Sequence, residues 1–101
     1  MLTVEVSREP DRARIILTGE LDLGADDDLR AAVAAALPAQ RVEVDLADLA
    51  YCDSSGVNAL IEARLRLREQ GVPLYIVHPR GLVESVLRVC GVLTELSDPD
   101  L

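Results

Sequence analysis

The chain has 101 residues, half of them apolar, and a formal net charge of -8 at pH 7. This length and apolar content fit one compact domain with its own core, so we expect a single domain over residues 1–101. An acidic chain repels a phosphate backbone, and two Tyr without Trp or Phe offer no platforms for stacked bases, which argues against nucleic-acid binding.

The chain opens with the pattern of a strand hairpin. Residues 2–7 alternate apolar and polar side chains, the period of a strand with one wet face. A Pro-Asp pair within residues 9–12 suits a tight reversal, and a β-branched run follows over residues 13–19. We expect these two strands to pair antiparallel.

A helix and a third strand come next. The aspartates at 26–28 suit the first turn of a helix, whose positive end favours acidic side chains. Apolar residues then recur every four positions, at Leu29, Val33 and Leu37. This helix should end before Pro38. Residues 41–46 alternate again and predict a third strand.

The second half continues this alternation of helices and strands. An apolar stripe predicts a helix over residues 55–70, and Gly71 stands where a helix C-terminus favours glycine. Residues 72–77 are nearly continuously apolar, which is typical of a strand buried on both faces of a parallel sheet.

The last segment predicts a third helix and a loose end. Leu82, Val86 and Leu87 lie at helical spacing before Gly91. Residues 92–96 are expected to add a short edge strand, and residues 97–101 to fray.

The order strand, strand, helix, strand, helix, strand, helix predicts an α/β fold. Strands that alternate with helices are typically parallel neighbours, and the leading hairpin adds an antiparallel pair. We therefore expect a mixed sheet of four to five strands with helices packed against it.

Neither the first ten residues nor the cysteines indicate export or metal binding. Residues 1–10 lack the basic start and apolar block of a secretion signal, and no apolar run is long enough to cross a membrane. We expect a soluble cytosolic protein. Cys52 and Cys90 have neither Cys-x-x-Cys nor metal-ligand spacing, so we interpret both as buried free thiols. A Gly-rich phosphate loop is also missing, and we expect no cofactor.

The segment Asp53-Ser54-Ser55-Gly56 stands directly before the second helix. In its simplest interpretation, one of the first three side chains caps the helix and Gly56 lets the chain turn tightly out of the third strand. A cap is worth only about 1 kcal/mol and needs a single polar residue. The second hydroxyl is then free for another use.

A serine nucleophile is one such use, and the sequence argues against it. Gly56 stands two residues after Ser54, but Cys52 occupies the position where a nucleophile elbow has its first glycine. A serine nucleophile also needs a base, and the only histidine, His78, ends a strand between Val77 and Pro79. We therefore do not expect a serine hydrolase.

Phosphorylation is the other use. A phosphoserine at a helix N-terminus brings nearly two negative charges towards free N–H groups, so the fold can tolerate the modification. Its added charge and bulk would act on a bound partner without a large conformational change in this chain.

Two motifs, one at the end of the second predicted strand and one after the third, make the chain resemble the bacterial anti-sigma-factor antagonists, which are single STAS domains. They are Asp53-Ser54-Ser55-Gly56-Val57 after the third strand and the segment Leu17–Asp22, Leu-Thr-Gly-Glu-Leu-Asp. The resemblance covers the whole chain and extends to the late segment 86–96. It implies the STAS-type fold.

The resemblance also implies a partner-switching regulator of transcription in the bacterial cytoplasm, with no enzymatic activity of its own. In that family the first serine, here Ser54, is phosphorylated by an anti-sigma factor that is itself a serine kinase, and a serine phosphatase reverses the reaction. The unphosphorylated protein binds the kinase and frees the sigma factor. The resemblance places Asp22, Asp53 and Gly56 around the phosphorylation site and makes Ser55 the expected helix cap. The protein is expected to be a monomer or weak dimer.

Other STAS proteins supply the alternative. STAS domains also serve as subunits of stress-sensing scaffolds and of membrane lipid-transport complexes, without catalysis. The chain departs from many family members at Val57 and Asn58, and its run Asp26–Asp28 is unusually acidic. We interpret that run as a solvated helix start in preference to a docking site for a basic patch on the kinase.

Overall fold

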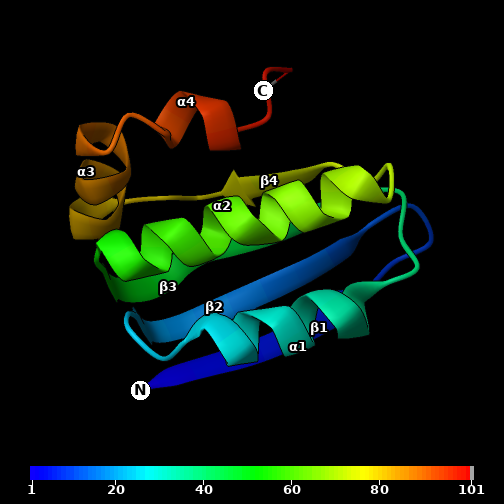
Figure 1. Ribbon diagram of the computed structural model, residues 1–101, viewed down its shortest axis with the longest axis horizontal. Coiled ribbons are helices and arrows are strands. Elements are labelled where there is room, and N and C mark those ends of the chain that lie inside the picture. The colour runs from blue at the N-terminus through cyan, green and yellow to red at the C-terminus, as the bar shows by residue number, and fades with distance from the viewer. Residues whose placement is uncertain (101) are drawn as a thin grey trace.

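The computed structural model describes residues 1–100, which form four strands and four helices (Figure 1). The strands are β1 (Leu2–Arg8), β2 (Ala13–Leu21), β3 (Val42–Cys52) and β4 (Leu74–Val77). The helices are α1 (Asp26–Ala36), α2 (Ser54–Glu69), α3 (Gly81–Val89) and α4 (Leu93–Leu96).

The strands form one mixed sheet in the order β1-β2-β3-β4. β1 and β2 pair antiparallel, from Leu2 opposite Gly19 to Arg8 opposite Ala13. β2 pairs parallel with β3, and β3 pairs parallel with β4. This confirms the predicted α/β fold with a leading hairpin, and residues 1–100 supply four strands to the sheet and no fifth.

The helices form a layer on one side of the sheet. α1 and α2 lie next to each other across one face, and α3 and α4 lie beyond β4 and the end of β3 (Figure 1). Inward-facing side chains of β2 and β3 alternate with polar ones, and the core between sheet and helices includes Ile15, Leu17, Leu46, Leu60 and Leu67. None of the helices within residues 1–100 is both long enough and apolar enough to span a membrane.

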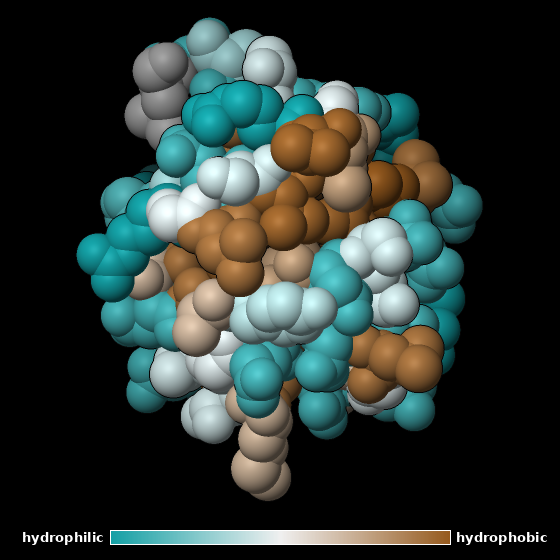
Figure 2. All heavy atoms as spheres, turned by 90° about the vertical axis from the view of Figure 1, so that its left-hand side faces the viewer, coloured by the Kyte–Doolittle hydropathy of each residue, from teal (hydrophilic) through white to brown (hydrophobic). Residues whose placement is uncertain are grey.

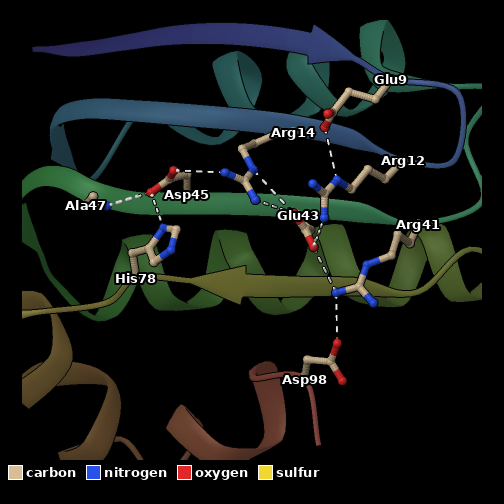
Figure 3. A network of polar contacts seen from close by, with 9 residues as sticks. All are labelled: Glu9, Arg12, Arg14, Arg41, Glu43, Asp45, Ala47, His78 and Asp98. Carbon is tan, nitrogen blue, oxygen red and sulfur yellow. Dashed lines mark hydrogen bonds and ion pairs between the residues drawn. The ribbon is translucent and has the colours of Figure 1, made fainter. Parts of the chain in front are cut away.

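The opposite face of the sheet carries a network of ion pairs around Glu43 (Figure 3). Glu43 is 4% exposed, and its carboxylate oxygens lie 2.7 Å from Arg14 Nη2, 3.0 Å from Arg41 Nη2 and 3.4 Å from Arg12 Nη1. Burial alone would raise the pKa of Glu43, but the bond to Arg14 and the charges of the three arginines together lower it. The network therefore covers and neutralises an otherwise costly buried charge.

The same network holds the C-terminal segment. Arg41 Nη2 lies 2.9 Å from Asp98 Oδ2, and the bonds from the Asp100 amide and from Arg41 lower the pKa of Asp98. Ser97 forms a single parallel bridge to Ile76 of β4. The prediction that the tail frays is therefore wrong for Ser97 and Asp98, while Leu101 lies outside the described residues.

Three further predictions need correction. Residues 92–96 are not an edge strand: Leu93–Leu96 form the short helix α4, and Arg64 of α2 pairs with Glu95 at 2.9 Å. β3 continues to Cys52 instead of ending at residue 46, because its parallel pairing with β2 runs on past two irregularities. Cys52 is buried as expected, but Cys90 is exposed at the end of α3.

Candidate functional site

The predicted site lies at the edge of the sheet where β2 and β3 end. Parallel strands place their carboxyl ends at one edge, and Leu21 at the end of β2 is the register partner of Cys52 at the end of β3. Both strands lead there into helix starts, because α1 begins at Asp26 and α2 at Ser54. The two motifs of the sequence, 35 residues apart at Gly19 and Ser54, thus meet in space.

Asp53 is the N-cap of α2. Its backbone is extended, and its Oδ1 accepts a hydrogen bond from the Gly56 amide at 3.1 Å. Its carbonyl accepts the first intrahelical bond, from the Val57 amide at 3.0 Å. The expectation that Ser55 caps the helix is wrong, because the extended residue before the first turn is Asp53 and a cap requires that conformation.

Gly56 lies within the first turn of α2 and brings the helix start close to β2. A Cβ at this position would overlap the carbonyl oxygen of Leu21 and would lie 2.9 Å from Cys52 Sγ. The glycine is therefore required for close packing between a helix and a strand end, and not for a tight turn as the sequence suggested. The Leu21 carbonyl also accepts the Asp53 amide at 3.4 Å, which fastens the turn to β2.

Ser54 is the first residue of α2 and is exposed. Since the Asp53 carboxylate already caps the helix, the Ser54 hydroxyl is not needed as a cap. Asp22, which follows Leu21, is half-buried beside this turn, and its carbonyl accepts the Ala25 amide at 3.1 Å at the entry to α1. The structure thus brings Asp22, Asp53, Ser54 and Gly56 to one edge.

Ser55 and Cys52 are less accessible. Ser55 is half-buried in the first turn of α2. Cys52 is buried beneath that turn, and its burial, followed by the charges of Asp53 and Cys90, raises its pKa to about 11. A thiol with this pKa stays protonated at neutral pH and is a poor nucleophile.

His78 does not serve Ser54 as a base. Its Nδ1 lies 3.3 Å from Asp45 Oδ1, next to the end of β4 (Figure 3). Residues 46–52 of β3 separate Asp45 from the Asp53 cap, and a strand rises about 3.3 Å per residue. No other imidazole is present in the chain. Among the described residues there is also no cluster of His, Cys, Asp or Glu that could hold a metal ion.

Two features of this edge escaped the sequence analysis. The Leu21 carbonyl lies close to the Gly56 backbone, and the type of side chain at position 21 gives no signal for such a contact. Exposed apolar side chains also stand at this edge, at Leu23 of the β2–α1 connection and on α3. The spacing of residues 82–87 predicted Leu82 and Val86 as part of the α3 stripe, but it did not predict that Leu82 and Val89 stay exposed.

Comparison with known proteins agrees with the fold. A protein family described as "Mlab, STAS domain" matches residues 4–97. No curated protein matches the chain at a significant level.

Several solved structures resemble the chain. Unphosphorylated SpoIIAA, an anti-sigma factor antagonist, is 23% identical over 97% of this chain and 86% of its own, with a TM-score of 0.75. The phosphorylated form of Bacillus SpoIIAA aligns at 20% identity over 95% of this chain and 89% of its own, with a TM-score of 0.66.

Two more matches are shorter. The STAS domain of an antisigma-factor antagonist from Rhodobacter sphaeroides is 29% identical over 76% of this chain and 84% of its own, with a TM-score of 0.58. A structure of Mglu aligns at 26% identity with a TM-score of 0.68 over 77% of this chain, which spans 20% of the Mglu chain.

Proposed function

The chain belongs to the STAS domain family, and from this premise we propose that it is an anti-sigma-factor antagonist that works by partner switching. In this proposal the unphosphorylated protein binds an anti-sigma factor that is a serine kinase, and so releases a sigma factor in the bacterial cytoplasm. Phosphorylation of Ser54 ends the binding, and a serine phosphatase restores it. The chain itself catalyses nothing.

The observation that carries the proposal is the division of roles at the start of α2. Asp53 caps the helix through its bond to the Gly56 amide, so the adjacent Ser54 hydroxyl is exposed and free to react. A serine needed for capping would lose its helix contact on modification. Ser54 has no such contact to lose.

The phosphoryl transfer is compatible with this position. The kinase would transfer the γ-phosphoryl group of ATP to Ser54 Oγ. The bond from the γ-phosphorus to the bridging oxygen breaks, an Oγ–P bond forms, the hydroxyl proton passes to a base of the kinase, and ADP leaves. The added negative charge lies at the positive end of α2, which offsets its proximity to Asp53 and Asp22.

The SpoIIAA structures support the proposal by analogy. An anti-sigma factor antagonist with this fold is known in an unphosphorylated and in a phosphorylated form. By analogy with that protein, we propose that Ser54 is the phosphorylated residue of this chain.

The test is incubation of the purified protein with ATP, Mg²⁺ and the kinase-type anti-sigma factor of the same genome. We expect the mass to rise by one phosphate in the wild type and in Ser55→Ala, and to stay constant in Ser54→Ala. Ser54→Ala should still bind the kinase, and Ser54→Asp should bind it more weakly. An unchanged wild-type mass would contradict the proposal.

A second candidate rests on the family description, which names Mlab beside STAS. The chain would then be a non-enzymatic subunit of a membrane lipid-transport complex or of a stress-sensing scaffold. Purification of the native protein with its partners separates the candidates, because a small complex with a kinase favours the antagonist and a large assembly favours the subunit.

A further inference from the structure

A groove runs between α1 and α2, which lie side by side in Figure 1. Its apolar walls come from Leu29, Val33 and Leu37 of α1 and from Ala59 and Ala63 of α2. Apart from Leu37, these residues are at most 8% exposed and belong to the core. The groove has a volume of about 200 Å³. We call it the α1–α2 groove.

Small side chains keep the groove open. Ala59 and Ala63 stand one turn apart on the side of α2 that lines it, and Ala34 of α1 lines it as well. Larger side chains at these positions would pack across the space between the helices. Apolar surface left facing water gains free energy when an apolar group covers it. An engineered apolar cavity of about 150 Å³ binds benzene, so the groove has room for an apolar group of about six to ten carbon atoms.

One end of the groove carries an arginine and an amide. Arg66 and Gln70 line it one turn apart on α2, and Leu37 lines it at the end of α1. Because α1 and α2 run in the same direction, these residues gather at the C-terminal end of the groove (Figure 1). Arg64 of α2 pairs with Glu95 at 2.9 Å, whereas no ion pair within residues 1–100 engages Arg66. Arg66 is exposed and can therefore take an anion from solution.

The carboxylates of the groove lie further towards its N-terminal end. Asp26 opens α1, where the positive end of the helix already compensates it, and Arg30 pairs with Asp27 at 2.9 Å. Glu62 lines the groove one turn before Arg66. A ligand with an anionic group at one end and an apolar remainder matches this distribution, since its charge meets Arg66 and only its apolar part passes the carboxylates.

We propose that the α1–α2 groove binds a small amphipathic carboxylate. Its carboxylate accepts hydrogen bonds from Arg66 and Gln70, and its apolar body of about six to ten carbon atoms covers the apolar walls. A medium-chain fatty acid and an aryl-alkyl acid share this chemistry. The inference does not rest on the proposed function, because Ser54 is not among the residues that line the groove.

A second apolar surface could also attract an amphiphile. Figure 2 faces the end of the molecule where α3 lies and shows apolar atoms at the surface there. On α3, Leu82 is 55% and Val89 87% exposed. A compound that merely adsorbs to exposed apolar atoms would bind at this end, and Val89→Ser would then weaken its binding.

The test titrates octanoate, and separately phenylpropanoate, into the isotope-labelled full chain below the micelle concentration. Amide chemical shifts and the heat of binding should saturate, with the largest shifts in α1 and α2. Octanol and octylammonium should bind at least about tenfold more weakly than octanoate, because neither forms a charge-assisted bond with the guanidinium. Binding of octanoate alone would support an acyl chain as the apolar body, and binding of phenylpropanoate alone an aryl group.

Two pairs of variants locate the site. Arg66→Gln should weaken octanoate binding by about tenfold and leave octanol binding unchanged, since only the charge-assisted bond is lost. Arg68→Gln is its control, because Arg68 is exposed on the same helix and does not line the groove. Ala34→Trp should fill the groove and abolish binding of both carboxylates. Ala35→Trp is its control, because Ala35 is the exposed neighbour that does not line the groove.

Both controls should bind octanoate within about twofold of wild type, and circular dichroism melts verify that each variant is folded. The inference is overturned if neither carboxylate binds saturably, if octylammonium binds more tightly than octanoate, or if Val89→Ser abolishes binding while Ala34→Trp does not. A wild-type dimer in light scattering that Ala34→Trp dissociates would assign the groove to a second copy and overturn it as well. None of these results bears on the phosphorylation of Ser54.

Discussion

Replacing Gly56 by alanine tests how the helix that carries Ser54 is fastened to the sheet. The new Cβ would overlap the Leu21 carbonyl oxygen and lie 2.9 Å from Cys52 Sγ. Neither neighbour can give way easily. The Leu21 carbonyl accepts the Asp53 amide at 3.4 Å at the end of a paired strand, and Cys52 is buried. The start of α2 must therefore move away from β2.

The expected loss of stability follows from two opposing effects. Overpacking of a tightly packed site costs typically about 1–3 kcal/mol. Alanine is the better helix former by up to about 1 kcal/mol, and position 56 lies in the first turn, where that gain is smaller. We expect Gly56→Ala to lower the free energy of unfolding by about 1–2 kcal/mol. For a chain of this size the melting temperature should fall by roughly 5–15 °C.

Urea unfolding monitored by circular dichroism measures this change. Asn58→Ala is the matched control, because Asn58 is exposed in the same helix and gains helix propensity without a clash. It should be as stable as wild type or more stable, by up to about 0.7 kcal/mol. If Gly56→Ala were also as stable as wild type, the close contact with Leu21 would not be the reason for a glycine at this position.

Two further changes probe the cap and the ion-pair network. Asp53→Ala should cost about 1 kcal/mol and Asp53→Asn much less, because asparagine also caps; equal thermal melts of the two variants would contradict the cap. The folded-state pKa values of Glu43 and Asp98 are lowered, so their stabilisation is present above the ordinary values of 4.5 and 3.8 and is lost as pH falls through the folded values. Urea midpoints should therefore drop steeply below about pH 4. Glu43→Gln should flatten that drop while lowering stability at pH 7. An equally steep drop in Glu43→Gln would show that protonation of Glu43 is not the cause of the loss of stability.

The elements of the fold could be predicted where the pattern was long and regular. The alternation of residues 2–7 and the β-branched run over residues 13–19 predicted the hairpin, and the apolar stripe over 55–70 predicted α2 within one residue at each end. The prediction for the short segment 92–96 was wrong. Residues 92–96 fit a strand as well as a helix, and the contact of Glu95 with Arg64 belongs to the helix.

The candidate site could be predicted in part. The Asp53-Ser54-Ser55-Gly56 segment marked the start of α2, and the resemblance paired it with Asp22, which the structure places beside it. Asp and Ser are both suitable cap residues by type. Asp53 is the cap because its backbone is extended, and the sequence does not show which residue adopts that conformation.

The sequence by itself determined the periodicities, the helix starts and the turn that exposes Ser54, because these depend on residues a few positions apart. The tertiary structure decided what those residues touch. Gly56 meets Leu21, Glu43 binds Arg12, and Arg41 binds Asp98, across separations of 35, 31 and 57 residues. Such contacts depend on how strands and helices pack, and local spacing does not encode them. For the same reason the helical spacing of residues 82–89 did not show that Leu82 and Val89 of α3 stay exposed.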